Sequence, residues 1–267
     1  MTAVVAFSYQ AADFKPNNQL ACCLGLRSAA SMDQLMTKLE RVTALSDDDR
    51  SGLLALFSDT HHFKKGGNIL REGEQPEHLH VLIDGWAAQC VTLVDGSRQT
   101  TAFLMPGDFC NGETTLLRRL DHGVVALTPV TIGTARRERL IALLLDRPNV
   151  ARAFWQTTLV DAAVLRSWLV NIAHRDSYRR IAHLMCELHT RLSCLGLVSG
   201  STCVVPLTQQ QLGNALGLTP VHVNRMLRRL RDEGLMEFRK RTLTLHNVAE
   251  LQEVANFDSG YLHIKLD

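Results

Sequence analysis

A group of basic and polar side chains near the C-terminus has the types and spacing that reading DNA requires. Arg225 can donate two hydrogen bonds to a guanine, and His222 and Asn224 can supply further contacts to base edges. Arg228 and Arg229 follow on the exposed face of the same predicted helix, where their charges suit phosphate oxygens. The pattern predicts a helix that reads bases with its N-terminal half and holds the DNA backbone with the rest.

A shorter helix and a tight turn are predicted directly before this helix. Thr208 is a suitable N-cap for the short helix, and Gly217 can adopt the left-handed conformation that ends it. Thr219 caps the next helix, and Pro220 takes its first position, where a missing N–H does no harm. Residues 207–231 therefore predict a helix-turn-helix, which places its second helix in the major groove of DNA.

The stretch that follows predicts a wing, formed by two short strands between residues 236 and 245 with a basic tip. From Leu207 to His246 the chain carries seven basic and three acidic side chains, so this unit is more positive than the whole chain, whose net charge is +2. A helical hairpin with a solvated basic face is the alternative. The expected DNA contacts are Thr208, Gln210, Thr219, Val221, His222, Asn224, Arg225, Arg228, Arg229, Arg239, Lys240 and Arg241.

The N-terminal half predicts a compact antiparallel barrel or sandwich, because short apolar stretches alternate with turn signals. Two helices are predicted before it, within residues 32–57, with Ser46 at the start of the second. A last strand pair is predicted within residues 124–134. The turn signals are Gly66-Gly67, Glu72-Gly73, Asp84-Gly85, Asp95-Gly96 and Pro106-Gly107-Asp108.

A long helix is predicted from about residue 149 to 172, and another from Asp176 to about Leu195, followed by a loop over residues 197–202. Apolar residues on the long helix alternate spacings of four and three, the pattern that pairs one helix with another. The alternative is that this face packs on the chain's own sheet. The residues expected on the dimer helix are Trp155, Ala162, Leu165, Leu169 and Ile172, with Ala151 and Thr158 completing the pattern.

From about Met32 to His246 the chain resembles the Crp/Fnr family of bacterial regulators. The resemblance implies an α+β fold: an N-terminal double-stranded β-roll of the cyclic-nucleotide-binding type, a long dimerisation helix and a C-terminal winged helix-turn-helix. Arg225 falls where the family has its base-reading arginine, whereas Pro220 and Val221 replace the polar or charged readers of better-known members. The matching segments are residues 69–74, 82–85, 106–109, 112–113, 171–182 and 207–231.

The resemblance implies a sequence-specific transcription regulator, not an enzyme, that binds palindromic double-stranded DNA as a homodimer. The β-roll would sense a signal, and a shift in helix packing around residues 171–176 would change the separation of the two recognition helices. RNA polymerase is a further partner that the resemblance implies. The expected domains are an N-terminal extension (1–31), a β-roll sensor (32–148), a dimerisation helix and hinge (149–174), a winged helix-turn-helix (175–250) and a C-terminal tail (251–267) without an assigned role.

The small-molecule effector stays unidentified, and the sequence argues against cyclic AMP. Family members that bind cyclic AMP follow a Gly-Glu pair with an Arg-Ser pair that holds the phosphate. This chain has Asp121-His122-Gly123-Val124 in that stretch, and Arg118 and Arg119 are out of register. The expected effector-pocket residues are Gly112, Glu113, Leu165 and Arg166, of which the last two replace hydroxyl residues that meet adenine in those members.

Some cysteines and histidines are candidates for cofactor sites, but no cofactor is expected. Cys22 and Cys23 are adjacent without a third cysteine nearby, unlike the cluster-binding members of the family, and Cys110 is a remote redox candidate. His78 and His80, with Asp84, partly imitate the metal motif of cupin enzymes. A cupin-like metal-dependent enzyme with an accessory C-terminal domain is therefore the alternative function, although His61, His62, His78 and His80 are more simply surface histidines.

The bulk composition sets only wide limits on the fold class and the function. The 267 residues suffice for two domains, and 46% apolar residues are ordinary for a globular protein. No apolar run approaches the ~18 residues that a membrane span needs, and no secretion signal is expected. The seven cysteines are scattered, so a reducing cytoplasm without disulfides is expected.

Overall fold

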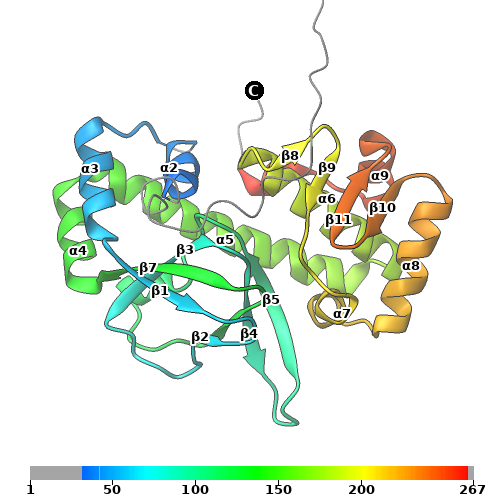
Figure 1. Ribbon diagram of the computed structural model, residues 1–267, viewed down its shortest axis with the longest axis horizontal. Coiled ribbons are helices and arrows are strands. Elements are labelled where there is room, and N and C mark those ends of the chain that lie inside the picture. Colours follow the sequence, from blue (N-terminus) through cyan, green and yellow to red (C-terminus); the bar gives the residue numbers. More distant parts are fainter. Residues whose placement is uncertain (1–31, 42, 264–267) are drawn as a thin grey trace, which may run out of the picture.

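The structure is a computed structural model that describes residues 32–41 and 43–263. Its N-terminal half is a β-roll of two antiparallel sheets, with strand orders β1–β7–β3 and β2–β6–β4–β5 (Figure 1). The predicted antiparallel fold is thereby confirmed. The strands are β1 (Asp59–Phe63), β2 (Asn68–Leu70), β3 (His78–Asp84), β4 (Ala87–Thr92), β5 (Arg98–Leu104), β6 (Gly123–Ala126) and β7 (Val130–Arg136), with the short helix η1 (Gly112–Thr115) between β5 and β6.

Two glycines in the predicted turns allow close approaches that position neighbouring elements. Gly85, between β3 and β4, has a φ of +86°, and a Cβ there would lie 2.3 Å from the carbonyl oxygen of Pro129. Gly107 has a φ of +88°, and its Cβ would lie 2.7 Å from the carbonyl oxygen of Gln34. Glycine is required at both positions, since any side chain would meet backbone atoms. The turn at Gly107 therefore lies directly against the first helix.

Three helices cover one end of the roll: α2 (Asp33–Glu40), α3 (Asp47–Leu56) and α4 (Arg137–Asp146) (Figure 1). The predicted cap of α3 is present, because the Ser46 side chain accepts a hydrogen bond from the Asp49 backbone N–H while the Asp49 carboxylate accepts one from the Ser46 N–H. Apolar side chains of α2 and α3 pack in one core with Phe109 of the roll and Phe154 of the following helix.

The long helix α5 (Pro148–His174) begins at Pro148, one residue before the predicted start. One side of it carries Val164 and Trp168, which are buried against the roll and the next helix. Another side carries Leu165 and Leu169, which are 53% and 69% exposed. Neither α5 nor any other helix in the described ranges is long and apolar enough to cross a bilayer.

The C-terminal half contains the predicted helix-turn-helix and wing. Asp176 caps α6, because its carboxylate accepts a hydrogen bond from the Arg179 N–H at 2.9 Å. The prediction of a loop over residues 197–202 is wrong. This stretch contains a hairpin that turns at Gly200, which has a φ of +60°, and the hairpin adds two strands to the sheet of the wing. The elements are α6 (Ser177–Cys194), β8 (Val198–Ser199), β9 (Thr202–Val204), α7 (Gln209–Leu216), α8 (Pro220–Asp232), β10 (Met236–Arg239) and β11 (Thr242–Leu245), with sheet order β10–β11–β9–β8.

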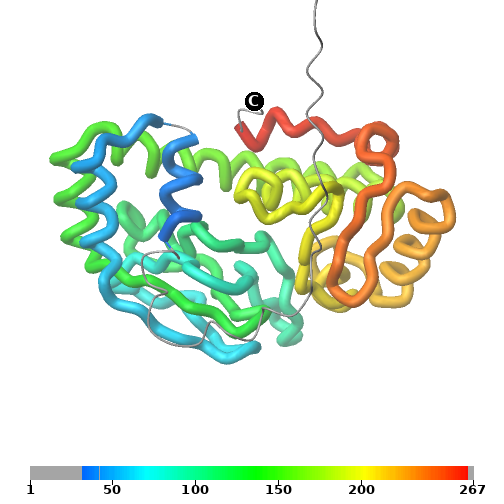
Figure 2. Tube along the Cα trace, turned by 45° about the horizontal axis from the view of Figure 1, so that its top comes forward, coloured from blue at the N-terminus to red at the C-terminus, as the bar shows by residue number. Residues whose placement is uncertain are grey.

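A C-terminal return segment, residues 247–263, follows the wing. It contains α9 (Val248–Ala255), which crosses the boundary expected at residue 250, and η2 (Ser259–Leu262). Figure 2 shows it running back from the wing over α6 and α5, with which α9 and η2 are in contact. Leu251, Ala255 and Leu262 are buried in the core of the C-terminal half. The residues expected to form a tail are therefore part of the folded unit as far as residue 263.

Candidate nucleic-acid interface and ligand cavity

The turn between α7 and α8 depends on three local features. Thr208 forms a capping box with Gln211 at the start of α7, and Gly217 ends this helix with a φ of +65°. Thr219 then caps α8 by accepting a hydrogen bond from the His222 N–H at 3.3 Å. Gly213 was missed by the sequence analysis: a Cβ there would lie 2.4 Å from the carbonyl oxygen of Leu218. A glycine inside a predicted helix was the available signal.

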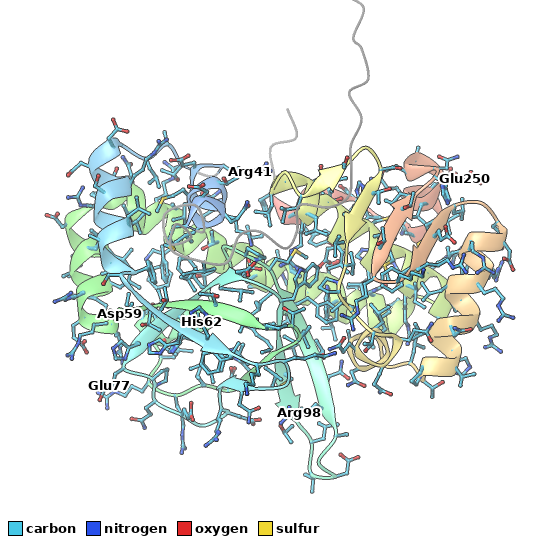
Figure 3. All side chains as sticks on the ribbon, in the orientation of Figure 1. Arg41, Asp59, His62, Glu77, Arg98 and Glu250 are labelled. Atoms are coloured by element: carbon cyan, nitrogen blue, oxygen red, sulfur yellow. The ribbon has the colours of Figure 1, made fainter. Side chains whose placement is uncertain are left out.

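One face of α8 is buried and the other is open to solvent. The apolar face, from Val223 to Leu230, packs in the core of the C-terminal half. Figure 3 shows side chains along α8 projecting away from the body of the molecule. The exposed residues of this face, hereafter the reading face, are Val221, His222, Asn224, Arg225, Arg228 and Arg229.

Several of the expected backbone contacts are engaged within the chain, among them Arg239, whose guanidinium lies 3.6 Å from the Glu237 carboxylate. The Arg229 guanidinium donates a hydrogen bond to the Glu233 carboxylate at 2.8 Å and lies 4.3 Å from the ring centroid of Tyr178. Gln210 donates to Asn214 at 2.8 Å. Neither Arg225 nor Arg228 makes a salt bridge with a carboxylate of the described residues. These two arginines are the reading-face cations that remain available to an outside ligand.

The wing tip is a two-residue turn between Arg239 and Thr242, which pair across β10 and β11. Its central residues, Lys240 and Arg241, have φ values of +48° and +66°. Tight hairpin turns of the I′ type need positive φ at both positions and favour Asn and Gly, so two long basic side chains are strained there. A strained and exposed pair of cations is typical of a functional site rather than of a structural turn.

A cavity of about 560 Å³ lies between the roll, α2, α5 and α6. Of the four residues expected in an effector pocket, Gly112, Glu113 and Leu165 line it, whereas the exposed Arg166 does not. Figure 3 marks Arg41, another lining residue, just beyond the end of α2. The remaining walls are largely apolar, as in most small-molecule sites.

Two carboxyl groups in the cavity wall, those of Glu113 and Asp161, form no ion pair with a lysine or arginine among the described residues. Only Glu113 has a histidine within ion-pair distance. Burial raises the pKa of Glu113, and its Oε1 atom lies 3.7 Å from Nε2 of His122 without a hydrogen-bond partner. Asp161 is an exposed residue of α5 that also lines the cavity. Loss of water and repulsion by Asp108 raise the pKa of Asp161 to about 7.

The stretch where cyclic-AMP-binding proteins of the resembled family hold phosphate offers no arginine or lysine to the cavity, and the only basic residue of this stretch in the lining is His122. Gly123 and Val124 are buried in β6. Arg118 is exposed and lies outside the cavity lining, and Arg119 donates to the carbonyl oxygen of Gly73 at 2.8 Å. The wall carries Glu113 and Asp121 in the same region. This arrangement disfavours a phosphodiester ligand.

The sites weighed for cofactors are not assembled in the described part of the chain. His78 and His80 point to the same face of β3, but no group of three or more His, Cys, Asp or Glu residues between 32 and 263 is placed to hold a metal. Burial raises the pKa of the Cys110 thiol, which opposes the reactive thiolate form. Cys22 and Cys23 lie outside the described residues.

Comparisons with known proteins agree with both halves of the fold. Residues 60–147 match the cyclic nucleotide-binding domain model, and residues 179–254 match the Crp-like helix-turn-helix domain model. The transcriptional activator protein FnrL of Cereibacter sphaeroides is 25% identical over 82% of this chain and 89% of its own length. The global nitrogen regulator of Synechococcus elongatus is 27% identical over 76% of this chain and 91% of its own length.

The structure of FixK2 from Bradyrhizobium japonicum has the same fold, with a TM-score of 0.67 and 23% identity over 73% of this chain and 96% of that chain. The alternative of a cupin-like enzyme is thereby wrong, because the relatives and the domain models are those of DNA-binding regulators. The chain belongs to the Crp/Fnr family and is a transcription regulator with a cyclic-nucleotide-binding-type sensor domain and a helix-turn-helix DNA-binding domain.

Proposed function

We propose that this regulator acts as a homodimer that reads a two-fold symmetric DNA site with one α8 helix in each half-site. The observation that carries this proposal is the open reading face of α8, with Arg225 at its centre and without an ion-pair partner among residues 32–41 and 43–263. Arg225 reads a guanine, while His222, Asn224 and Val221 contact neighbouring bases. Arg228, Thr208, Thr219 and the wing tip Arg239-Lys240-Arg241 hold the phosphate backbone, with Gln210 and Arg229 free to join them once their contacts within the chain open.

The dimer is supported by the outward face of α5. Leu165 and Leu169 are exposed there, and Ala162 and Ile172 are half-buried beside them. Trp155 belongs in part to the sensor core, because its ring lies 5.4 Å from the Phe154 ring. Leu159 and Val170 widen the exposed apolar strip. A second copy of α5 covers such a strip with the same residues, as two-fold interfaces require.

The cavity is proposed as the place where a small molecule would act on DNA binding. The missing phosphate-holding arginine and the uncompensated carboxyl groups of Glu113 and Asp161 support an effector other than cyclic AMP. A bound molecule would shift α5 against α6 near Asn171, and this shift would change the spacing of the two reading faces. Family membership supports RNA polymerase as the partner at the promoter.

The dimer is tested with Leu169→Arg, which places a charge in the centre of the apolar strip. We expect a monomer by sedimentation equilibrium, and affinity for a palindromic duplex weakened by at least about a hundredfold because avidity is lost. Leu145→Arg is the matched control, since Leu145 is a leucine on α4 that is at least as exposed as Leu169. A Leu169→Arg protein that stays dimeric would place the interface elsewhere.

A further inference from the structure

The far end of α6 reaches out of the DNA-binding domain into the sensor. Arg191, near the end of α6, is only 14% exposed at its side chain. Its guanidinium donates hydrogen bonds to the carbonyl oxygen of Phe103 at 3.0 Å and to the carboxylate of Asp108 at 3.2 Å. Both acceptors belong to the sensor domain, so one side chain bridges the two domains.

Asp108 is itself fixed from two other directions. It accepts a hydrogen bond from the Met105 N–H at 2.6 Å, which closes the turn at Gly107, and it forms an ion pair with Lys38 of α2. Burial alone would raise the pKa of Asp108, but the charges of Lys38 and Arg191 outweigh it and lower the pKa. The acceptor for Arg191 is therefore an ionised carboxylate in a rigid turn.

The same guanidinium is also tied to the rest of the C-terminal half. Its Nη1 atom lies 3.5 Å from Oε1 of Glu187, which is fully buried. Glu187 accepts hydrogen bonds from the Trp168 indole of α5 at 3.0 Å and from the Tyr261 hydroxyl of the return segment at 2.7 Å. The network thus connects α2, the turn after β5, α5, α6 and η2.

The interdomain ion pair also forms part of the cavity wall. Lys38, Asp108 and Arg191 all line the cavity, and Leu262 next to Tyr261 lines it too. An anion that entered the cavity near these residues would compete with Asp108 for Arg191, and a cation would compete with Arg191 for Asp108. The contact that joins the domains is therefore open to whatever occupies the cavity.

We propose that Arg191 is the positioning residue that fixes the reading face relative to the sensor, through its ion pair with Asp108 in the cavity wall. The pair thereby transmits the state of the cavity to DNA binding. This inference rests on the proposed two-fold reading of DNA, because positioning matters only when two reading faces must match two half-sites. The reading face itself contains neither residue and is not altered when the pair is removed.

The physical consequence concerns half-site spacing rather than base recognition. A domain held in one orientation matches one separation of half-sites and rejects others. Without the ion pair the DNA-binding domain can rotate about the apolar contacts that remain, so more separations become acceptable and the best one is bound less selectively. A single half-site needs no such alignment.

The test compares three duplexes: a palindrome with the preferred spacing, the same half-sites moved apart by about two base pairs, and one half-site alone. For Arg191→Gln and Asp108→Asn we expect the preference for the first duplex over the second to fall by at least about fivefold, the lower end of typical coupling between sites. Affinity for the single half-site should not change. The double variant should be no worse than the more severe single one, since both remove the same pair.

Two controls separate positioning from damage. Asp48→Asn removes an ion pair with Arg147 that lies wholly inside the sensor, and it should leave the spacing preference intact. Arg191→Lys keeps the charge but loses the planar guanidinium, so it should retain part of the spacing preference. It also keeps the proposal testable if Arg191→Gln folds poorly.

Equal weakening on all three duplexes, or an unchanged spacing preference, would overturn the proposal. A wild-type protein that binds both spacings equally would refute the two-fold reading of DNA itself, and the proposal with it.

Discussion

At the scale of single residues, Arg225 and Arg228 lie on the same exposed face of α8 but are assigned different tasks. Arg225 falls in the N-terminal half of the helix, where we propose that it reaches base edges, and Arg228 falls further along, where we propose that it meets the DNA backbone. Both lack carboxylate partners among the described residues, so substituting either one removes no ion pair of the fold and isolates its proposed contact to DNA.

Arg225→Ala should lose discrimination between the preferred site and its base-substituted variant by about 1–3 kcal/mol. Arg228→Ala should weaken binding to all duplexes alike and make the salt dependence of log K shallower by about one unit. Equilibrium titrations at several salt concentrations measure both. If Arg225→Ala kept full discrimination, the assignment of the reading face would be wrong.

Asp161 gives a prediction on pH. Its pKa of about 7 in the folded chain lies above its ordinary value of 3.8, so the folded state binds its proton more tightly than the unfolded state. The stability that this proton contributes is complete below pH 3.8 and is lost as the pH rises through about 7. Asp161→Asn should therefore melt higher than the wild type at pH 8, and by a clearly smaller margin at pH 5, where most of this stability is still present.

Thermal denaturation over this pH range measures the effect. Asp84→Asn is a suitable control, because this exposed carboxylate does not line the cavity. A difference between Asp161→Asn and the wild type that stayed constant from pH 5 to pH 8 would contradict the environment assigned to Asp161.

At the scale of elements, the wing tip has two basic residues at positions where positive φ values strain their backbone and lower the stability of the turn. Lys240→Asn combined with Arg241→Gly gives the residues that a turn with two positive φ values favours. The free energy of unfolding should rise by about 1–2 kcal/mol because strain is relieved. Affinity for DNA should fall, and the salt dependence should become shallower by about two units because two phosphate contacts are lost.

The control for charge is Lys64→Asn with Lys65→Asn, which removes two exposed cations from the sensor domain. It should leave the salt dependence unchanged. Denaturant unfolding and DNA titration together decide the matter: a stabilised wing with unaltered DNA binding would mean that the tip does not meet phosphate.

Local signals predicted the helices and their ends well. Thr208, Thr219 and Gly217 act at the ends of α7 and α8 as expected, since caps depend on a few neighbouring residues. The hairpin at Gly200 was missed because its strands are only two and three residues long. The return segment was missed because its burial depends on α6 and α5, far away in the sequence.

The candidate sites likewise contain some features that local sequence patterns predict and others that they do not. The exposure of Arg225 and the lining role of Glu113 followed from helix periodicity and family position. The pair of Arg191 with Asp108 joins residues 83 positions apart, and no spacing rule connects them. Contacts of this kind arise from how the two domains pack, which local patterns do not encode.

At the scale of the whole molecule, the two domains do not pack as independent units. Trp86 and Phe103 of the sensor lie in the same buried cluster as Ile181 and Leu184 of α6, and Arg191 adds a polar bridge beside them. The exposed apolar face of α5 is left over for the proposed second copy. Sensor, α5 and reading face therefore form one connected path, along which the proposed change in the cavity would reach DNA.

The most direct test of this account is selection of binding sites from randomised duplex DNA by the purified protein without added ligand. The account predicts enrichment of a palindrome with half-sites about one helical turn apart, each containing a guanine that Arg225 reads. Enrichment of a single asymmetric element, or none at low salt, would contradict the dimeric reader.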